Sequence, residues 1–319
     1  FGECGGCSWQ DVAYGEQLER KCRRVAEAFA GLPAFDLDVP PVVPSDALRH
    51  FRNKVEFTFA AGAGGSTPAL GFHPSRNPYR VVDLSVCHLQ RDPSDAIRLA
   101  AREIALEAGI PFFDRPARRG GLRNLIVRTT TTGQVMVVLV LYEEDARSAA
   151  IVLDGLAGRF PSIESLHWVA HQDVPDKIGD AKVRLHAGSS HVVERLGDLE
   201  FRIGPRTFFQ PHTAQAARLY RTIVVWSELA STDLVYDLCT GAGTIALSVA
   251  PRAGRVVGFE SVAEAVADAR ANAEANGIAN VEFRAGDVAD LLEAAGPADV
   301  VIADPGRTGL PRRAVLRLA

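Results

Sequence analysis

Asp237-Leu-Cys-Thr-Gly241-Ala-Gly243-Thr244 is preceded by the apolar run Leu234-Val-Tyr and followed by a helical pattern over residues 245–250. A strand, a glycine-rich turn and a helix in this order form the cofactor pocket of doubly wound α/β domains. Glycine lets the chain turn tightly and approach a ligand closely, and the following helix has free N–H groups in its first turn. The stretch therefore predicts a parallel sheet with a cofactor held at this loop.

Acidic residues end the strands that follow the loop. Glu260 ends the second predicted strand, seventeen residues after Gly243, about where a Rossmann-like unit places the acid that binds ribose hydroxyls. Asp287 follows the third strand, where a carboxylate can meet an adenine amino group, and Asp304 ends the fourth. Ligands bind at the carboxyl ends of strands in such sheets, so we expect these acids at one edge. The predicted strands cover residues 234–236, 255–260, 281–284 and 298–304.

The spacing Asp-x-x-x-Gly-x-Gly, with acids after the second, third and fourth strands, resembles a class I S-adenosylmethionine methyltransferase. It differs from the dinucleotide fingerprint Gly-x-Gly-x-x-Gly because residue 246 is alanine. Helices are expected over residues 213–229 and 262–276, the second capped by Ser261. A doubly wound domain that binds no cofactor is the alternative.

The length of 319 residues allows two domains with a small appendage. We expect an iron–sulfur segment over residues 1–40, a central α+β RNA-binding domain over 41–200 and a Rossmann-like domain over 201–319. The net charge of −4 gives no global basic signal for nucleic acid, so an RNA-binding face must be local. Nothing resembles a secretory signal or an apolar span of membrane length, and we expect a cytoplasmic monomer.

Five cysteines, an odd number, fit a reducing compartment and metal chemistry better than a disulfide framework. Cys4-Gly-Gly-Cys7 could be a redox dithiol, although no strand precedes it, or half of a zinc site, which needs two more ligands. An iron–sulfur cluster needs four thiolates, and Cys87 is a plausible distant third. Cys22, in an amphipathic helix over residues 11–31, is expected to be a small core residue.

The central region alternates strands and helices in a manner typical of an α+β domain. Its predicted strands cover residues 54–60, 70–73, 80–83, 125–130, 134–142 and 163–170, with helices over 93–108 and 145–157 and a hairpin over 192–201.

Two local clusters are basic, one over residues 49–54 and one over 114–128. They could be ordinary solvated faces. They could equally contact phosphates, with stacking from Phe51, Phe112 and Phe113. The arginines of the second cluster are Arg115, Arg118, Arg119, Arg123 and Arg128.

Gln210 follows two aromatic residues and precedes the helix over residues 213–229. It could be a helix-start feature, or it could contact the methionine end of the cofactor. Both interpretations remain open.

In their order along nearly the whole chain, these motifs resemble the bacterial RNA (uracil-5-)-methyltransferases, and most closely the iron–sulfur branch that modifies 23S ribosomal RNA. The matching residues are Cys4-Gly-Gly-Cys7 with Gln10 and Tyr14, Arg52-Asn53-Lys54, residues 81–90, Leu122-Arg123-Asn124, Phe208-Phe209-Gln210, the loop from Asp237 to Thr244, Glu260, and Asp304-Pro-Gly-Arg307-Thr-Gly-Leu310.

The resemblance implies S-adenosylmethionine and a [4Fe–4S] cluster as cofactors, with 23S ribosomal RNA as partner. The cluster would lie on Cys4, Cys7, Cys87 and one earlier cysteine outside this sequence. Asp304 and Arg307 would shape the pocket of the flipped base. The implied cofactor-binding residues are Gln210, Asp237, Cys239, Gly241, Gly243, Thr244, Glu260, Asp287 and Asp304.

The chemistry implied is methylation of C5 of uracil, which is a poor nucleophile. A thiolate that adds to C6 makes C5 enolate-like, and a base later removes the C5 proton. The family places both groups after the Asp-Pro motif. Because the sequence begins in mid-motif and ends soon after a strand, we expect a fragment that lacks both ends and binds S-adenosylmethionine without making 5-methyluridine.

Two alternatives to the ribosomal enzyme remain. A transfer RNA uracil-5-methyltransferase is the first, although that branch usually lacks the cluster cysteines. A non-catalytic RNA-binding module is the second, and the intact Asp237, Gly241, Gly243, Glu260 and Asp304 argue against it.

Overall fold

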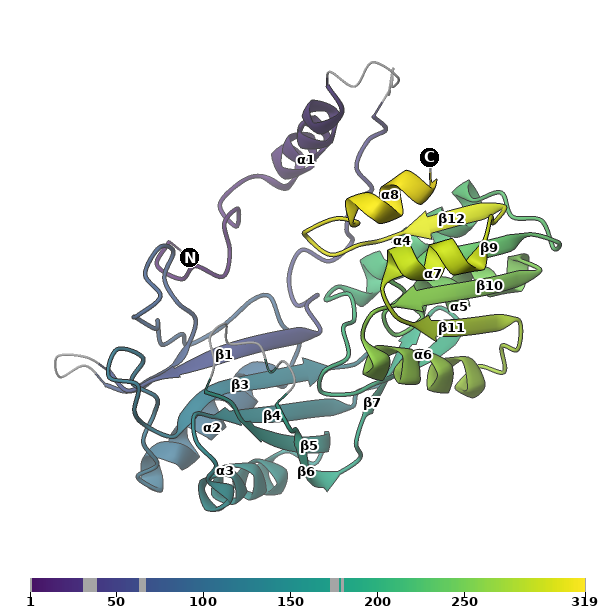
Figure 1. Cartoon of the computed structure of the whole chain (residues 1–319). Coiled ribbons are helices and arrows are strands. Elements are labelled where there is room, and N and C mark those ends of the chain that lie inside the picture. Colours follow the sequence, from purple (N-terminus) through teal and green to yellow (C-terminus); the bar gives the residue numbers. More distant parts are fainter. Residues whose placement is uncertain (1, 31–38, 63–66, 173–177, 179–180, 319) are drawn as a thin grey trace.

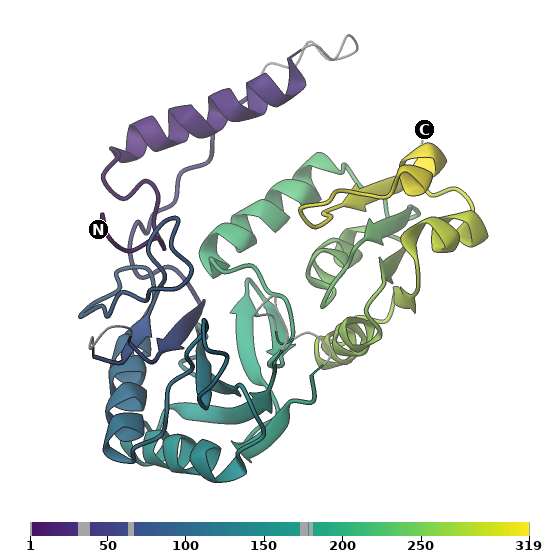
Figure 2. The same cartoon turned by 60° about the vertical axis from the view of Figure 1, so that its left-hand side comes forward.

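The computed structural model describes residues 2–30, 39–62, 67–172, 178 and 181–318. They form two units, each built on its own sheet, and an arm, α1 (Tyr14–Phe29) (Figure 1). The arm stands away from both sheets (Figure 2), and none of its residues is buried. The prediction of a helix over residues 11–31 is confirmed with shorter ends, and residue 31 lies outside the described residues. No helix in the described ranges has the length and apolar character needed to span a membrane.

The first unit is a six-stranded sheet covered by two helices on one face. Its elements are β1 (Lys54–Ala60), β2 (Ala69–Gly71), α2 (Ser94–Glu107), β3 (Leu122–Thr129), β4 (Val135–Leu141), α3 (Ala146–Arg159), β5 (Ile163–Ala170) and β6 (Arg184–Gly188). The strand order is β2-β1-β3-β4-β5-β6, and only β4 and β5 run parallel, because α3 connects them. Alternate residues such as Phe57 and Leu125 pack under α2 and α3. β3 and β4 are buried along their whole length, which explains the continuous apolar run of β4, whereas β3 also buries Arg123, Asn124 and Arg128.

The second unit is a parallel sheet with the order β11-β10-β9-β12. Its elements are α4 (Thr213–Trp226), β9 (Leu234–Leu238), α5 (Thr244–Val249), a 3₁₀ turn (Ala250–Arg252), β10 (Arg255–Glu260), α6 (Ala263–Ala275), β11 (Val281–Ala285), α7 (Val288–Ala295), β12 (Val300–Ala303) and α8 (Arg312–Leu318). All four strands expected after residue 230 are present. Because they run parallel, their carboxyl ends meet at one edge, as predicted.

A hairpin of β7 (Val192–Leu196) and β8 (Leu199–Ile203) joins the units. β8 passes through the predicted domain boundary at residues 200 and 201. One apolar core continues from Ile126 and Val138 of the first sheet, through Phe201 of β8, to Val235 of β9. The two units therefore share a core instead of being joined by a linker.

Two expectations about local structure in the first unit and the arm are wrong. Residues 80–83 form no strand, and Val82 makes only an isolated bridge with Phe72, since the Arg80 carbonyl binds the His73 side chain instead. Cys22 is not a core residue. Its Sγ lies half-exposed, 3.9 Å from each of the carbonyl oxygens of Val39 and Pro40, because α1 packs on neither sheet.

A third expectation, in the second unit, is also wrong. Ser261 does not cap α6, which has no side-chain cap. The Ser261 hydroxyl instead donates to Glu260 Oε1 at 3.1 Å. The strand β6 has no counterpart among the predicted strands. Its residues are at best half-buried, so the apolar alternation that marks a strand is weak there.

Candidate active site

The loop between β9 and α5 adopts the strained conformation that its glycines allow. Gly243 has a φ of 82°, and a Cβ at this position would lie 3.0 Å from the Phe283 ring. Gly241 has a φ of 56°, and no atom of the described residues lies within 4 Å of where its Cβ would be. The loop thus packs tightly on one side and faces open space on the other, which leaves room for a ligand.

Asp237 holds this loop from within. Its side chain is 0% exposed, and Oδ2 accepts hydrogen bonds from Thr240 Oγ1 at 2.5 Å and from the backbone N–H of Ala246 at 3.0 Å. Burial raises the pKa of Asp237 from 3.8 to about 7. The carboxyl group therefore positions the loop backbone, and its contact with a cofactor stays a prediction.

Glu260 supports the same loop from the neighbouring strand. Its Oε2 accepts the Gly241 N–H at 3.0 Å, and its Oε1 accepts the Val262 N–H at 3.0 Å. Burial, and then the charges of Glu260, Asp237 and Asp304, raise the pKa of Cys239. Asp237 and Glu260 therefore both bind the loop that carries this thiol, at the carboxyl edge of the sheet.

Tyr220, which the sequence analysis did not single out, joins α4 to the loop. Its hydroxyl accepts a hydrogen bond from Thr244 Oγ1 at 3.1 Å. Burial raises the pKa of Tyr220, and the charges of Asp304 and Asp237 add to the effect. A tyrosine on the apolar face of a helix carries no signal that it reaches a cofactor loop, so the sequence could not reveal it.

The remaining predicted residues of this edge are less enclosed. Asp287 is exposed and caps α7, with Oδ1 accepting the Ala289 N–H at 2.9 Å, so it has a structural role. Asp304 and Arg307 are exposed in the connection from β12 to α8. The contact of Asp287 with adenine and the contacts of Asp304 and Arg307 with the target base remain predictions.

Gln210 lies where the two units meet. Its backbone carbonyl oxygen accepts a hydrogen bond from Asn53 Nδ2 at 2.9 Å. His212 caps α4 and stacks on Phe51, with ring centroids 4.7 Å apart. Phe208 is 69% exposed whereas Phe209 is buried. The junction thus presents one exposed aromatic ring, Phe208, close in sequence to the helix that carries Tyr220.

Cys4 and Cys7, at the start of the chain, lie within electrostatic reach of Cys87. Burial, and then the Cys87 and Cys4 thiols, raise the pKa of Cys7. The Gly6 N–H points to Cys4 Sγ at 3.4 Å. Within the described residues, however, no three or more His, Cys, Asp or Glu side chains are arranged to hold a metal ion. The thiols are neighbours and do not form a ligand set as they stand.

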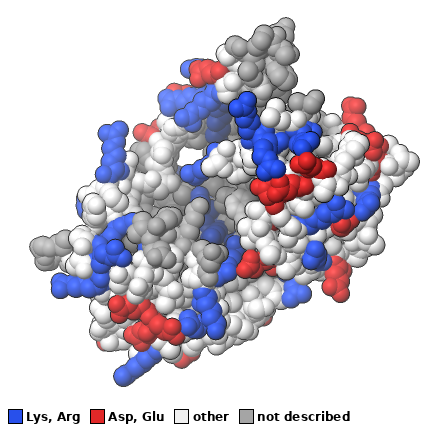
Figure 3. Space-filling model, viewed as in Figure 1, with Lys and Arg blue, Asp and Glu red and all other residues white. Residues whose placement is uncertain are grey.

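The second basic cluster divides into buried and exposed arginines. Arg123 and Arg128 are buried, and they donate to the carbonyl oxygens of His171 at 2.5 Å and Thr207 at 2.9 Å. Arg118 and Arg119 are exposed. A solvated face therefore describes only part of this cluster. Figure 3 shows lysines and arginines gathered on the side of the first unit and above the hollow between the units.

Comparisons with known proteins agree with this architecture. A family model described as "Methyltransferase domain" matches residues 230–314. An uncharacterized RNA methyltransferase of Porphyromonas gingivalis is 40% identical over 97% of this chain and 72% of its own length. One of Bacteroides thetaiotaomicron is 35% identical over 97% of this chain and 73% of its own.

A solved structure is similar over almost the whole chain. It is the tRNA (uracil-54, C5)-methyltransferase of Pyrococcus abyssi in complex with S-adenosyl-L-homocysteine, with a TM-score of 0.82 and 28% identity. The match covers 99% of this chain and 72% of that one. The fold is thus that of a class I S-adenosylmethionine methyltransferase.

Proposed function

The chain belongs to the RNA methyltransferases, and from that premise we propose that it directs a methyl group from S-adenosylmethionine to C5 of a uracil in RNA. The observation that carries the proposal is the likeness of 99% of the chain to an enzyme named for uracil C5 methylation. Glu260, which binds the Gly241 N–H at the carboxyl edge of the sheet, supports S-adenosylmethionine as the methyl donor.

The residues at the carboxyl edge fit the cofactor by their chemistry. When bound, S-adenosylmethionine supplies an electrophilic methyl group. Glu260, at the end of β10, would accept hydrogen bonds from the ribose hydroxyls, and the open side of Gly241 leaves space for the cofactor. Gln210 would meet the methionine end, and Asp287 the adenine. Thr244 and Cys239 complete the loop on which the cofactor would lie.

The target base must leave its stack to reach this edge. Asp304 and Arg307 would line its pocket, and the exposed Phe208 ring offers a surface for stacking. Cys239 is a poor candidate for the attacking thiolate. Its raised pKa keeps the thiol protonated at neutral pH.

We favour 23S ribosomal RNA as the substrate because Cys4, Cys7 and Cys87, the residues expected in that branch, lie together. Transfer RNA is the second candidate. It is favoured by the likeness to the Pyrococcus abyssi enzyme, whose name specifies uracil 54 of transfer RNA.

Transfer of labelled methyl groups tests the reaction and the substrate together. The full-length protein is incubated with unmodified 23S ribosomal RNA or unmodified transfer RNA, and the product nucleoside is identified by mass spectrometry. We expect 5-methyluridine in the ribosomal RNA. Label in transfer RNA alone would reassign the substrate, and label on another base or at another atom would refute the reaction.

A [4Fe–4S] cluster on Cys4, Cys7 and Cys87 is a separate part of the proposal. Its support is the proximity of the thiols, and no step of methyl transfer depends on it. Protein purified without oxygen should be brown and absorb broadly at the blue end of the visible range. Colourless protein that contains stoichiometric zinc would mean that these cysteines bind zinc and not an iron–sulfur cluster.

A further inference from the structure

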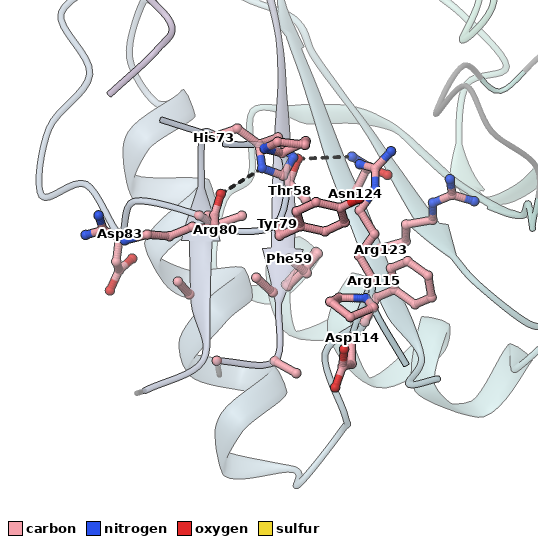
Figure 4. Close-up of a pocket in the computed structure, with 18 of the residues that line it drawn as sticks. Thr58, Phe59, His73, Tyr79, Arg80, Asp83, Asp114, Arg115, Arg123 and Asn124 are labelled. Atoms are coloured by element: carbon pink, nitrogen blue, oxygen red, sulfur yellow. Dashed lines mark hydrogen bonds between the residues drawn. The ribbon is translucent and has the colours of Figure 1, made fainter. Parts of the chain in front are cut away.

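A pocket of about 730 Å³ opens in the first unit, where β1 and β3 run side by side (Figure 4). Its floor includes Thr58 of β1 and Asn124 of β3, which are paired in the sheet. Its walls come from the segments over residues 73–83 and 113–116. None of its lining residues belongs to the loop between β9 and α5, so it is distinct from the candidate active site.

Two buried acceptors in this pocket have no partner in the part of the chain that the structure describes. The Asn124 side chain is only 2% exposed. Its amide nitrogen points to Thr58 Oγ1 at 3.5 Å, and its Oδ1 has no hydrogen bond. His73 Nδ1 lies 2.8 Å from the carbonyl oxygen of Arg80. A carbonyl only accepts, so Nδ1 carries the hydrogen and Nε2 of the neutral ring is an acceptor, also unpartnered. Buried polar groups are rarely left unpaired, so a donor from a ligand is the expected complement.

The rest of the lining suits a nucleotide. Tyr79 is 66% exposed at the rim, and Figure 4 shows its ring beside Asn124. Arg123 lies over the Phe113 ring at 5.5 Å. The charged side chains in the lining are four arginines and two aspartates, namely Arg80, Arg102, Arg115, Arg123, Asp83 and Asp114. Arg102 pairs with Asp83 at 3.3 Å and Arg80 pairs with Glu3, so the exposed ring of Tyr79 is the feature of this lining that suits an unpaired base.

We propose that this pocket binds one unstacked RNA base that carries an exocyclic amino group, at a position other than the base that is methylated. This inference rests on the proposed function, because it assumes an RNA substrate. An amino group offers two N–H donors to the two orphaned acceptors. Uracil offers a single N–H between two carbonyl oxygens, and those oxygens would face Asn124 Oδ1 or His73 Nε2. The pocket therefore discriminates against uracil, the base proposed for the active site.

Cytidine and uridine monophosphate are matched probes, because they differ in the amino or carbonyl group at C4 and in the hydrogen on N3. Titration of the full chain, followed by nuclear magnetic resonance, should show cytidine monophosphate binding about tenfold more tightly. Asn124→Ala should remove this preference while leaving affinity for S-adenosyl-L-homocysteine unchanged. Equal affinity for the two nucleotides, tighter binding of uridine monophosphate, or binding of neither would overturn the proposal.

Tyr79→Ala provides a variant whose folding is not at risk, since this side chain is mostly exposed. Affinity for unmodified substrate RNA should fall about tenfold, with Tyr79→Phe near the original affinity and Trp226→Ala, an exposed aromatic on α4, as the matched control. Unchanged RNA affinity in Tyr79→Ala would refute the binding of an RNA base in this pocket and leave the proposed function intact. If the full-length protein methylates no RNA, the proposed function itself fails.

Discussion

The two units bury charges of opposite sign. The second unit buries the carboxyl group of Asp237, whereas the first buries the guanidinium groups of Arg98, Arg123 and Arg128. In both units uncharged groups supply most of the hydrogen bonds to these side chains, and Arg98 in addition pairs with Asp95 at 3.3 Å. Asp237 binds groups three and nine residues ahead of it, but Arg98 and Arg128 bind carbonyls 28 and 79 residues away. The carboxyl group therefore fixes one local loop, and the arginines join segments that are distant in sequence.

The largest effect is expected from removing a buried arginine. Arg98 is 0% exposed and donates to the carbonyl oxygens of Leu70 at 3.0 Å and Leu84 at 2.6 Å. Arg98→Met should lower the free energy of unfolding by about 3–5 kcal/mol, because buried acceptors lose their donor. Chemical denaturation measures it. Arg102→Met, one turn further along α2, removes a partly exposed ion pair with Asp83 and one hydrogen bond to the Pro68 carbonyl, and should cost about 1 kcal/mol. Equal losses would mean that Arg98 does not organise these segments.

The buried carboxyl group should make stability depend on pH in a specific direction. The pKa of Asp237 in the folded protein is about 7, against 3.8 for an ordinary aspartate. Between these values the folded protein keeps a proton that the unfolded chain has released. Stability should therefore fall as pH rises from about 4 to about 7, by on the order of 2–4 kcal/mol.

Denaturation curves at several pH values, compared with those of Asp237→Asn, measure this contribution. The variant should lose this part of the slope, since asparagine does not titrate in the range. The same slope in both proteins would show that Asp237 is ionised throughout.

Glu260 supports the loop from outside, and its loss should act mainly on binding. Glu260→Ala removes the acceptor for the Gly241 N–H and the predicted ribose contact. Affinity for S-adenosyl-L-homocysteine should fall by about 1.5–3 kcal/mol, measured by calorimetry. Glu264→Ala, an exposed acid in the first turn of α6, is the control and should bind as before. Unchanged affinity in Glu260→Ala would show that this residue does not contact the cofactor.

The smallest effect is expected at Ser261. A true helix cap would cost about 1 kcal/mol on replacement by alanine. Because the Ser261 hydroxyl binds Glu260 and leaves α6 uncapped, Ser261→Ala should change stability by less than about 0.5 kcal/mol. A loss of 1 kcal/mol or more in thermal unfolding would restore the capping role.

The difference between contacts that are close in sequence and contacts that are distant in sequence also explains what could be predicted from the sequence. The order of strands and helices after residue 230 follows from local signals, because Gly241 and Gly243 turn the chain between adjacent elements. The position of Glu260 at the strand end follows in the same way. Tyr220 beside Thr244, and Asn124 beside His73 in the pocket, depend on pairings across distant segments. No local pattern in the sequence encodes those pairings, and the isolated bridge of Val82 with Phe72 shows how a strand-like run can be used otherwise.

The core that runs from the first sheet through Phe201 to Val235 affects how far apart two bases of a bound RNA would be held. A hinge between the units would let the two sites move apart or together. A continuous apolar core instead sets their separation when the chain folds. The number of nucleotides between the methylated uracil and the base held beside Tyr79 would then be constant, so the protein would select its target by spacing along the RNA as well as by sequence.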